Sequence, residues 1–413
     1  MPPLRRVQAA LSEATERFAS ELAAPAREPP QWDEFEWIMA KATAVLHGVT
    51  PLMASTLRWP GPPDWKSFAD QQRRHTLLRH QRIEALLARI DEASRRAGIA
   101  AVPLKGAALH ALGLYHAGQR PMADIDLLVR EGDAVPMLRV LESLGYRGTS
   151  ATRRHRILQP QKPAGESSLQ VEPAFGEHAL APIKIELHSR ICEQLPVLAV
   201  DVSERIFPRA PRAGLNGYPS DVALLMHLVL HAAGNMVPRG LRLIHLHDIS
   251  LVAARMGEAD WAEFLRSRVV GRPLWWAVPP LELASRYYPR TIPHQVLTAL
   301  RPECPRALRT KSQHQTLSDV SYAALGMEAF PGLAWTGSLS EKLQCVLARV
   351  HPGPEQRAVR AVVQAEPWSG NWSRLSQSQR ILRAILMRPP RQCSMYIVRA
   401  ALTSARRIGG SES

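Results

Sequence analysis

The stretch VPLKGAALHALGLYHAGQRPMADIDLLVR, residues 102–130, decides the fold. It overlaps a short apolar run at 99–104, which predicts a buried strand. Lys105 and Gly106 then turn the chain into a short helix, and the run at 125–129 predicts a second strand. A strand, a glycine turn, a helix and a second strand in close succession indicate a small unit that mixes helices with a sheet.

Two aspartates stand at the start of the second strand. Asp124 and Asp126 are separated by one residue, so both carboxylates project from the same face. Carboxylates that converge in this way repel unless a cation lies between them, which makes this face an oxygen-rich site for hard divalent ions, chiefly Mg²⁺. A later run at 183–188 (IKIELH) alternates apolar and polar side chains and offers Glu186 as a third carboxylate.

The turn at Lys105 and Gly106 has a feature that suits phosphates. Because backbone N–H groups open the helix that follows the turn, this position favours negative charge. Three carboxylates on neighbouring strands that face a glycine turn are the arrangement that two-metal phosphoryl or nucleotidyl transfer requires.

The sequence on either side of this unit is helical in pattern. Upstream, helical periodicity covers residues 4–24, 32–46 and 65–97. Downstream, helices are expected at 133–144, from 221 onward and, as the last one, around 379–388, whereas 147–165 has a basic and irregular pattern. We therefore predict an α+β protein with a small mixed sheet between two helical regions. The expected division is an N-terminal helical region (1–97), a core with the sheet (98–200), a helical domain (201–290) and a basic, proline-punctuated C-terminal helical region (291–413).

Composition and charge exclude several classes of protein. The 413 residues are 46% apolar and 22% charged, which is a globular composition and excludes a disordered chain. Lys and Arg number 52 against 37 Asp and Glu, and this net charge of +15 suits a polyanionic partner, for instance at the basic segment 147–156. The four cysteines are scattered, which excludes a disulfide scaffold and fits a reducing compartment. With no signal peptide and no apolar run of membrane length, we expect a cytoplasmic protein without membrane contact.

Histidines gather in the downstream helices. His227 and His231 are four residues apart on an apolar helix, and His245 and Asp248 follow. This grouping is compatible with zinc, but no cysteine or HExxH motif completes such a site. We favour a pair of helices packed around buried imidazoles, with Asp248 pairing one of them.

Several motifs follow one another in the order of a known family: LKG, a tyrosine after a helix, an arginine, DIDLLV, IELH, HLVLHAAGN and LRLIHLHDISLV. Over residues 40–260 the chain resembles the uncharacterised nucleotidyltransferase family of the polymerase-β nucleotidyltransferase superfamily. The resemblance implies a minimal nucleotidyltransferase fold and the transfer of a nucleoside monophosphate from a nucleoside triphosphate (NTP), with two Mg²⁺ ions. By position, Asp124 and Asp126 would bind the metals, and Glu186 would act as a further ligand or as the base toward the acceptor hydroxyl.

The glycine turn departs from the pattern of the wider superfamily. That superfamily usually has Gly-Ser at the turn, whereas this chain has Gly106 followed by Ala107, and Asp124 lies 18 positions after Gly106. The resemblance places Gly106 against the triphosphate with Lys105 nearby. Lys105 and Arg120 are then expected to supply the contact that the serine hydroxyl would make.

The predicted function is Mg²⁺-dependent nucleotidyl transfer from an NTP to a hydroxyl or phosphate acceptor on a small molecule, a peptide or a protein. Two alternatives remain open. A non-catalytic nucleic-acid-binding protein would use the positive charge, although no zinc finger, RNP1 or KH loop is present. A degenerate transferase fold would serve as an assembly partner, and the three intact carboxylates argue against it.

Overall fold

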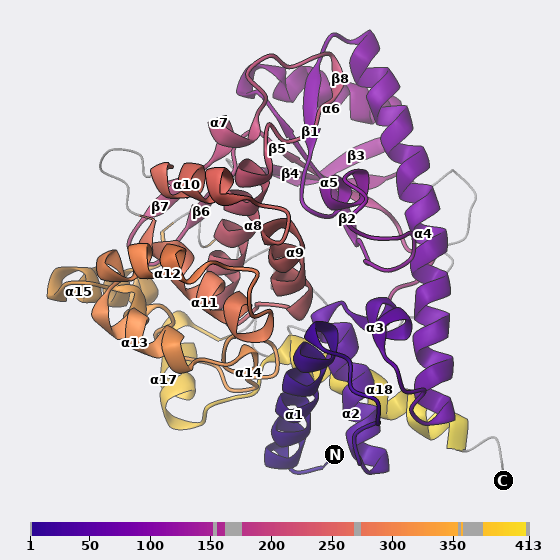
Figure 1. Cartoon of the computed structure of the whole chain (residues 1–413), viewed down its shortest axis with the longest axis vertical. Helices are drawn as coiled ribbons and strands as arrows, with labels where there is room; N and C mark the ends of the chain where they lie inside the picture. The colour runs from indigo at the N-terminus through magenta and orange to yellow at the C-terminus, as the bar shows by residue number, and fades with distance from the viewer. Residues whose placement is uncertain are drawn as a thin grey trace.

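Along the chain of this computed structural model, a small sheet follows an N-terminal group of helices and precedes a larger helical region (Figure 1). The structure describes residues 2–151, 155–161, 176–267, 274–353, 357 and 375–409. The expected α+β class, a small mixed sheet flanked by helices with helical regions at both ends, is confirmed. Within the described part of the chain, no helix combines the length and the apolar character needed to span a bilayer.

Four helices precede the sheet: α1 (Leu4–Ala23), α2 (Glu34–His47), α3 (Thr50–Thr56) and α4 (Pro63–Arg96). A capping box starts α2, because the Asp33 carboxylate accepts from the Glu36 N–H and the Glu36 carboxylate accepts from the Asp33 N–H. Gly48 ends α2 in the left-handed region, at a φ of 66°. The short helix α3 has no counterpart among the predicted helices; Pro51 lies in its first turn, where a helix tolerates proline.

Six strands form the mixed sheet in the order β3-β4-β5-β2-β1-β8. They are β1 (Ala100–Pro103), β2 (Asp124–Val129), β3 (Tyr146–Ala151), β4 (His155–Pro160), β5 (Lys184–His188) and β8 (Gly214–Leu215). β2 is central and runs parallel to β5 and antiparallel to β1. The connections hold α5 (Gly106–Ala111), the 3-10 turn η1 (Glu131–Asp133), α6 (Ala134–Ser143), a separate two-stranded sheet of β6 (Cys192–Gln194) and β7 (Ala199–Asp201), and α7 (Ser203–Ile206).

The two faces of the sheet belong to different cores. On one face, Ile125 and Leu127 of β2 share a core with Ile83 and Ile90 of α4 and with residues of α6. Leu128, on the opposite face, belongs to the core of the larger helical region. Because side chains alternate along a strand, the even-numbered residues of β2 all point toward that second face.

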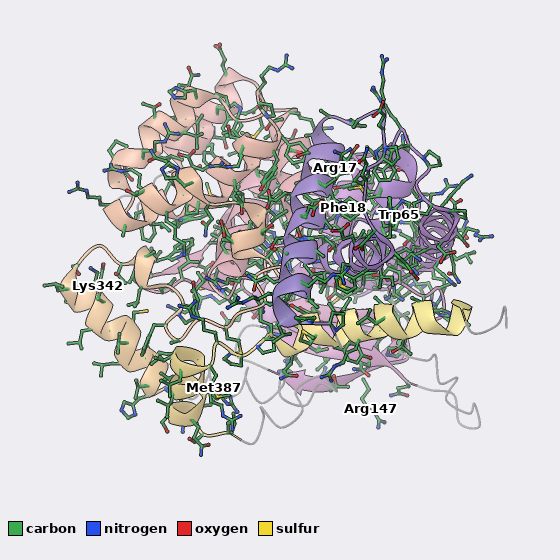
Figure 2. All side chains as sticks on the ribbon, turned by 90° about the horizontal axis from the view of Figure 1, so that it is seen from below. Arg17, Phe18, Trp65, Arg147, Lys342 and Met387 are labelled. Carbon is green, nitrogen blue, oxygen red and sulfur yellow. The ribbon has the colours of Figure 1, made fainter. Side chains whose placement is uncertain are left out.

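Helices make up most of the chain after the sheet. They are α8 (Asp221–Met236), α9 (Leu243–Ala253), α10 (Glu258–Arg266), η2 (Trp275–Ala277), α11 (Val278–Tyr287), α12 (His294–Leu300), η3 (Arg301–Glu303), α13 (Arg306–His314), α14 (Leu317–Val320), η4 (Leu333–Trp335), α15 (Leu339–Val350), α17 (Gln377–Leu386) and α18 (Gln392–Gly409). The final helix, α18, returns to the N-terminal group, where Met395 and Val398 share a core with Met39 of α2. Figure 2 shows α18 beside these helices, with Phe18 and Trp65, whose rings stack at 5.4 Å, inside the group.

Two predictions about local structure are wrong. The segment 147–165 contains most of β3 and all of β4, because β4 pairs antiparallel with β5 and buries Leu158, although the polar residues around it give a loop-like pattern. Arg153 and Arg154 of the predicted basic loop lie outside the described residues. The helix predicted around 379–388 corresponds to α17 and is followed by a further helix, α18.

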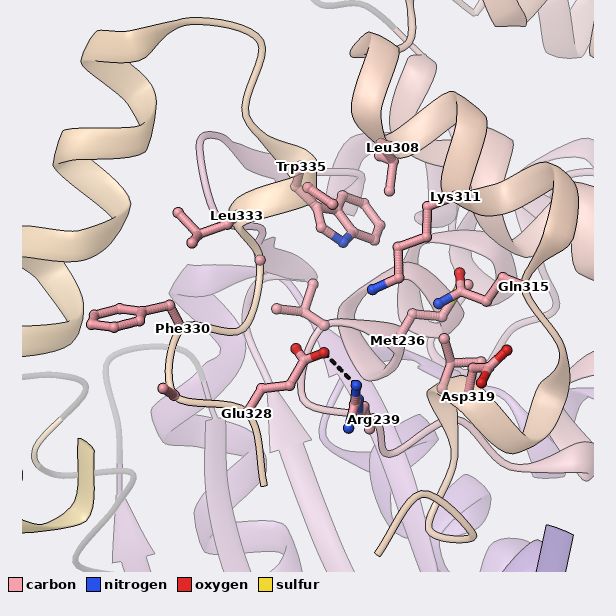
Figure 3. Close-up of a pocket in the computed structure, with 15 residues that line it drawn as sticks. Met236, Arg239, Leu308, Lys311, Gln315, Asp319, Glu328, Phe330, Leu333 and Trp335 are labelled. Carbon is pink, nitrogen blue, oxygen red and sulfur yellow. Dashed lines mark hydrogen bonds and ion pairs between the residues drawn. The ribbon is translucent and has the colours of Figure 1, made fainter. Parts of the chain in front are cut away.

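The helical region encloses a pocket of about 330 Å³ beside α13 and η4 (Figure 3). Trp335 and Leu308 give it apolar walls, and the Lys311 side chain reaches into it. An ion pair between Arg239 and Glu328 closes one side. None of the predicted site residues lines this pocket.

Candidate active site

The parallel pairing of β2 with β5 brings the predicted carboxylates together. Asp126 is the register partner of Glu186, and Asp124 is the partner of Lys184. Since register partners on adjacent strands point to the same face, Asp124, Asp126 and Glu186 share the face that looks toward the larger helical region. The sequence predicted this grouping from the alternation of each strand, and the structure adds the register.

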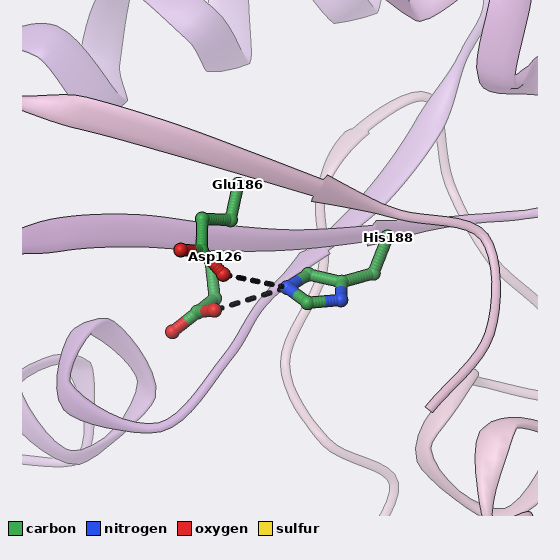
Figure 4. Close-up of side chains that lie close together, drawn as sticks. All are labelled: Asp126, Glu186 and His188. Atoms are coloured by element: carbon green, nitrogen blue, oxygen red, sulfur yellow. Dashed lines mark hydrogen bonds and ion pairs between the residues drawn. The ribbon is translucent and has the colours of Figure 1, made fainter. Parts of the chain in front are cut away.

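His188 completes a compact cluster with two of the carboxylates (Figure 4). Its Nε2 shares a hydrogen bond of 3.0 Å with Asp126 Oδ1 and lies 3.6 Å from Glu186 Oε2. His188 was not among the predicted site residues. The signal that identifies it is the alternation of β5, which places residue 188 on the same face as residue 186.

Lys105 reaches the cluster from the glycine turn. Its backbone has a φ of 49° and a ψ of −116°, a conformation that residues other than glycine rarely adopt. The turn brings Nζ to 3.3 Å from both carboxylate oxygens of Asp126, and the Lys105 N–H donates to the Tyr218 hydroxyl at 3.4 Å. A strained residue held in this way beside a charged cluster is typical of functional sites.

The pKa values of the three carboxylates shift in two different directions. Burial alone would raise the pKa of Asp126, but the Lys105 ammonium and the hydrogen bond from His188 hold that pKa well below its usual range. Burial and the charge of Asp126 raise the pKa of both Asp124 and Glu186. Although burial works against its charge, Lys105 has a raised pKa because Asp126 and Asp124 stabilise the ammonium.

The donor set fits a divalent cation. An oxygen of Asp126, an oxygen of Glu186 and a ring nitrogen of His188 all lie within 4.8 Å of one another, and no second group of this kind occurs among the described residues. Burial is the main cause of the raised pKa values of Asp124 and Glu186, and the charge of Asp126 adds a repulsion that a cation would relieve. Carboxylate oxygens suit Mg²⁺, while the imidazole also suits other divalent metals. Asp124 lies on the same face but outside this group of three.

Arg79 of α4 holds the two strands in register. Its guanidinium donates to the carbonyl oxygens of Met122 at 2.7 Å and of Ala123 at 2.6 Å, just before β2, and to that of Ala181 at 2.6 Å, just before β5. Arg79 is buried, so these bonds are shielded from water. No local pattern in the sequence marks this residue, because its partners lie 43 to 102 positions away.

Of the histidines on α8 and α9, His227 is buried, whereas His231 and His245 are half-buried. His227 Nδ1 shares a hydrogen bond of 2.7 Å with the Tyr218 hydroxyl, and the rings of His231 and His245 pack at 5.0 Å. Burial lowers the pKa of all three imidazoles. The favoured interpretation, helices packed around buried imidazoles, agrees with these contacts, and these histidines form no metal-binding group within the described chain.

Arg120 forms a buried ion pair with Asp248, and Gly106 packs against its guanidinium. The Arg120 guanidinium donates to both oxygens of Asp248, at 2.9 and 2.7 Å, and the Tyr115 hydroxyl donates to the same carboxylate at 2.6 Å. The expectation that Asp248 pairs with a histidine is therefore wrong. A Cβ on Gly106 would lie 2.3 Å from Arg120 Nη1 and 2.9 Å from Met122 Sδ, so the glycine lets this pair pack against α5. The nucleotide-binding roles of Gly106 and Arg120 stay predictions.

Comparison with known proteins agrees with the geometry of the site. The sequence profile of a family described as an uncharacterised nucleotidyltransferase matches residues 33–271, more than half of the chain, including the sheet, α8 and α9. No curated protein and no solved structure matches the chain. The matched segment contains the whole carboxylate cluster and the turn at Lys105, and the chain belongs to this uncharacterised nucleotidyltransferase family.

Proposed function

We propose that the protein is a Mg²⁺-dependent nucleotidyltransferase that transfers a nucleoside monophosphate from an NTP to a hydroxyl or phosphate acceptor. The observation that carries the proposal is the pairing of Asp126 with Glu186 on parallel strands, beside Asp124 and the turn at Lys105. Membership of a nucleotidyltransferase family supports transfer chemistry and an NTP as substrate. The acceptor is proposed by chemical class only.

The residues of the site have complementary roles in this reaction. Asp124, Asp126 and Glu186 would hold two Mg²⁺ ions, which supply charge stabilisation at the phosphates when bound. The acceptor oxygen attacks the α-phosphorus of the NTP, a new P–O bond forms, and the bond to the leaving pyrophosphate breaks. Glu186 is suited to take the proton of an acceptor hydroxyl, because burial and the charge of Asp126 raise its pKa, and a carboxylate with a raised pKa is the stronger base.

The His188 imidazole orients the cluster. Its Nε2 shares a hydrogen bond with one oxygen of Asp126 and lies 3.6 Å from an oxygen of Glu186. Lys105 neutralises the charge of Asp126 from the other side. We assign to these two side chains the positioning of the carboxylates.

The test incubates the purified protein with each of the four NTPs, labelled at the α-phosphate, together with Mg²⁺ and fractions of a cell extract as the source of acceptor. Transfer of label with release of pyrophosphate, abolished by a chelator, is the expected result. Glu186→Gln should reduce transfer by roughly a hundredfold or more with little change in melting temperature. Glu142→Gln, which removes an exposed carboxylate on α6, is the matched control and should leave transfer unchanged.

Two results would contradict the proposal. The first is that no fraction supports metal-dependent transfer of label from any NTP. The second is that Glu186→Gln keeps the full wild-type rate, which would make Glu186 part of the scaffold and require a different third carboxylate.

A further inference from the structure

Arg242 is a cation without an acidic partner at the start of α9. Among the described residues, no carboxylate lies within ion-pair distance of its guanidinium. Glu177, an acid that acts on it at longer range, is itself paired with Arg79 at 3.5 Å. A partly buried cation that lacks a counter-ion has lost part of its hydration, and this cost is relieved when an anion binds.

The guanidinium of Arg242 is held in place against the end of α2. Its Nε donates to the Leu46 carbonyl at 3.1 Å. A Cβ on Gly48 would lie 2.1 Å from Arg242 Nη2, so the glycine leaves room for the guanidinium in this orientation. The next residue, Leu243, donates its N–H to His47 Nδ1 at 2.9 Å and fixes the backbone. The orientation of the guanidinium is therefore set before any ligand binds.

A chain of contacts connects the start of α9 with the carboxylate site. One turn after Arg242, the ring of His245 packs against the ring of His231 on α8 at 5.0 Å. One turn earlier on α8, His227 Nδ1 shares a hydrogen bond of 2.7 Å with the Tyr218 hydroxyl, which accepts from the Lys105 N–H. Because Lys105 pairs with Asp126, these contacts lead from the start of α9 to the carboxylates.

The contrast with Arg120 indicates which arginine is available to a ligand. The Nε and Nη2 atoms of Arg120 both donate to Asp248. Arg242, in contrast, donates to the described residues through its Nε alone. The Lys105 ammonium is bound to Asp126. A guanidinium presents several N–H donors in a planar fork that matches the oxygens of a phosphate.

We propose that Arg242 binds the triphosphate of the NTP, the contact that the sequence assigned to Arg120. This inference rests on the proposed function, because it takes the ligand to be the nucleotide that the carboxylate site acts on. A phosphorylated acceptor has the same chemistry, so the experiment separates the two sources of phosphate.

The experiment measures binding by calorimetry, independently of turnover. Wild type, Arg242→Gln and Arg242→Lys are titrated with each NTP and Mg²⁺, with the matching nucleosides, and with inorganic tripolyphosphate. Arg255→Gln is the matched control, because it removes the same charge just after α9 from an arginine that pairs with Asp221 at 2.9 Å. Thermal unfolding of each variant shows whether the loss of the bond to Leu46 affects the fold.

We expect Arg242→Gln to weaken NTP and tripolyphosphate binding roughly tenfold to a hundredfold, as for a lost hydrogen bond to a charged group. Nucleoside binding should be unchanged, Arg242→Lys should be intermediate, and Arg255→Gln should match wild type. NTP affinity that Arg242→Gln leaves unchanged in a folded protein overturns this inference but not the proposed function. If Arg242→Gln binds NTP normally and loses only affinity for free tripolyphosphate, the guanidinium belongs to a separate phosphate site, such as that of a phosphorylated acceptor, and the inference is also overturned. If wild type binds no NTP, both the inference and the proposed function fail.

Discussion

Asp124 and Asp126 stand two residues apart yet experience opposite environments. Asp126 is stabilised in its charged form by Lys105 and His188, whereas burial and a neighbouring charge disfavour the charged form of Asp124. The same substitution at the two positions should therefore have different effects on the fold, even though both residues belong to the proposed site.

For Asp126→Asn we expect turnover to fall by several orders of magnitude and the free energy of unfolding to fall by about 3 kcal/mol, because the buried Lys105 ammonium loses its counter-ion. For Asp124→Asn we expect a comparable loss of turnover with stability kept or increased, because a disfavoured charge is removed. Denaturant unfolding at pH 7 beside the transfer assay checks both. Equal stabilities for the two variants would contradict the difference in environment.

Gly106 is predicted to matter for packing. Gly106→Ala should lower the free energy of unfolding by about 1–3 kcal/mol, because the added methyl group meets the Arg120 guanidinium, which its two bonds to Asp248 hold in place. Gly132→Ala is the control, since a Cβ there meets nothing within 4 Å. A melting temperature as high as that of the control would show that Arg120 moves aside freely.

For single residues, the sequence predicts those site residues that the alternation of apolar and polar side chains along a strand places on one face. Asp126 and Glu186 follow from strand periodicity, and His188 is within reach of the same reasoning. Arg79 and Arg242 are beyond it, because each acts through partners far away in the sequence: 102 positions for the Ala181 carbonyl and 196 for the Leu46 carbonyl. Contacts of that length depend on how helices pack, which composition and periodicity do not determine.

At the scale of elements, His47 joins three helices. The ring accepts from the N–H of Leu243 at the start of α9 and shares a hydrogen bond of 3.1 Å with the Thr15 hydroxyl of α1. Burial, together with the charge of Arg242, lowers the pKa of His47 to about 3. The imidazole is therefore neutral in the folded protein throughout the physiological range.

The stability of the protein should fall as pH drops from about 6.5 toward 3. In that window the unfolded chain binds a proton at His47 that the folded chain does not, which costs up to about 1.4 kcal/mol per pH unit. His47→Gln should reduce the slope of the unfolding free energy against pH, measured by urea denaturation. His110 and His247, with pKa values lowered to about 4, add to the wild-type slope. A slope that His47→Gln does not change would show that other groups cause it.

Helices and strands with a strong hydrophobic periodicity are predicted well, whereas strands at the side of the sheet are not. The long helix α4 and the strands β2 and β5 agree with their predicted positions, because each has a broad or alternating apolar pattern. β3 and β4 lie at one side of the sheet, where fewer apolar side chains are needed. Two helices, α3 and α18, were not predicted. The apolar face of α18 packs on α2, and α3 has Pro51 in its first turn, where a helix tolerates proline.

At the scale of the whole molecule, the predicted regions share one core. Phe18, Leu104, Leu230 and Trp335, which come from the four predicted regions, belong to the same buried cluster. The division of the chain at residues 97, 200 and 290 stays a prediction, and we propose no independent folding for its parts.

The net charge of +15 predicts weak binding to any polyanion. We expect RNA affinity to fall steeply with salt, by about a thousandfold or more between 50 and 200 mM if six or more phosphates are contacted, and to need no divalent metal. Glu186→Gln should leave this binding intact or slightly stronger while transfer is lost. Filter binding at several salt concentrations measures the RNA affinity of the wild type and of Glu186→Gln. Tight RNA binding at physiological salt, together with no NTP turnover, would favour the nucleic-acid-binding alternative.

The packing of α18 on α2 has a consequence for synthesis on the ribosome. About 350 residues separate Met39 from Met395, which meet in one core. At about 5–20 residues per second, translation needs roughly 20 to 70 s to cover that distance. Throughout this interval the apolar side chains of α2 that share this core with α18, Met39 among them, lack their contacts with α18. The apolar surface of α2 is therefore synthesised early and buried by α18 late. We expect a chaperone that binds the nascent chain to act on this surface.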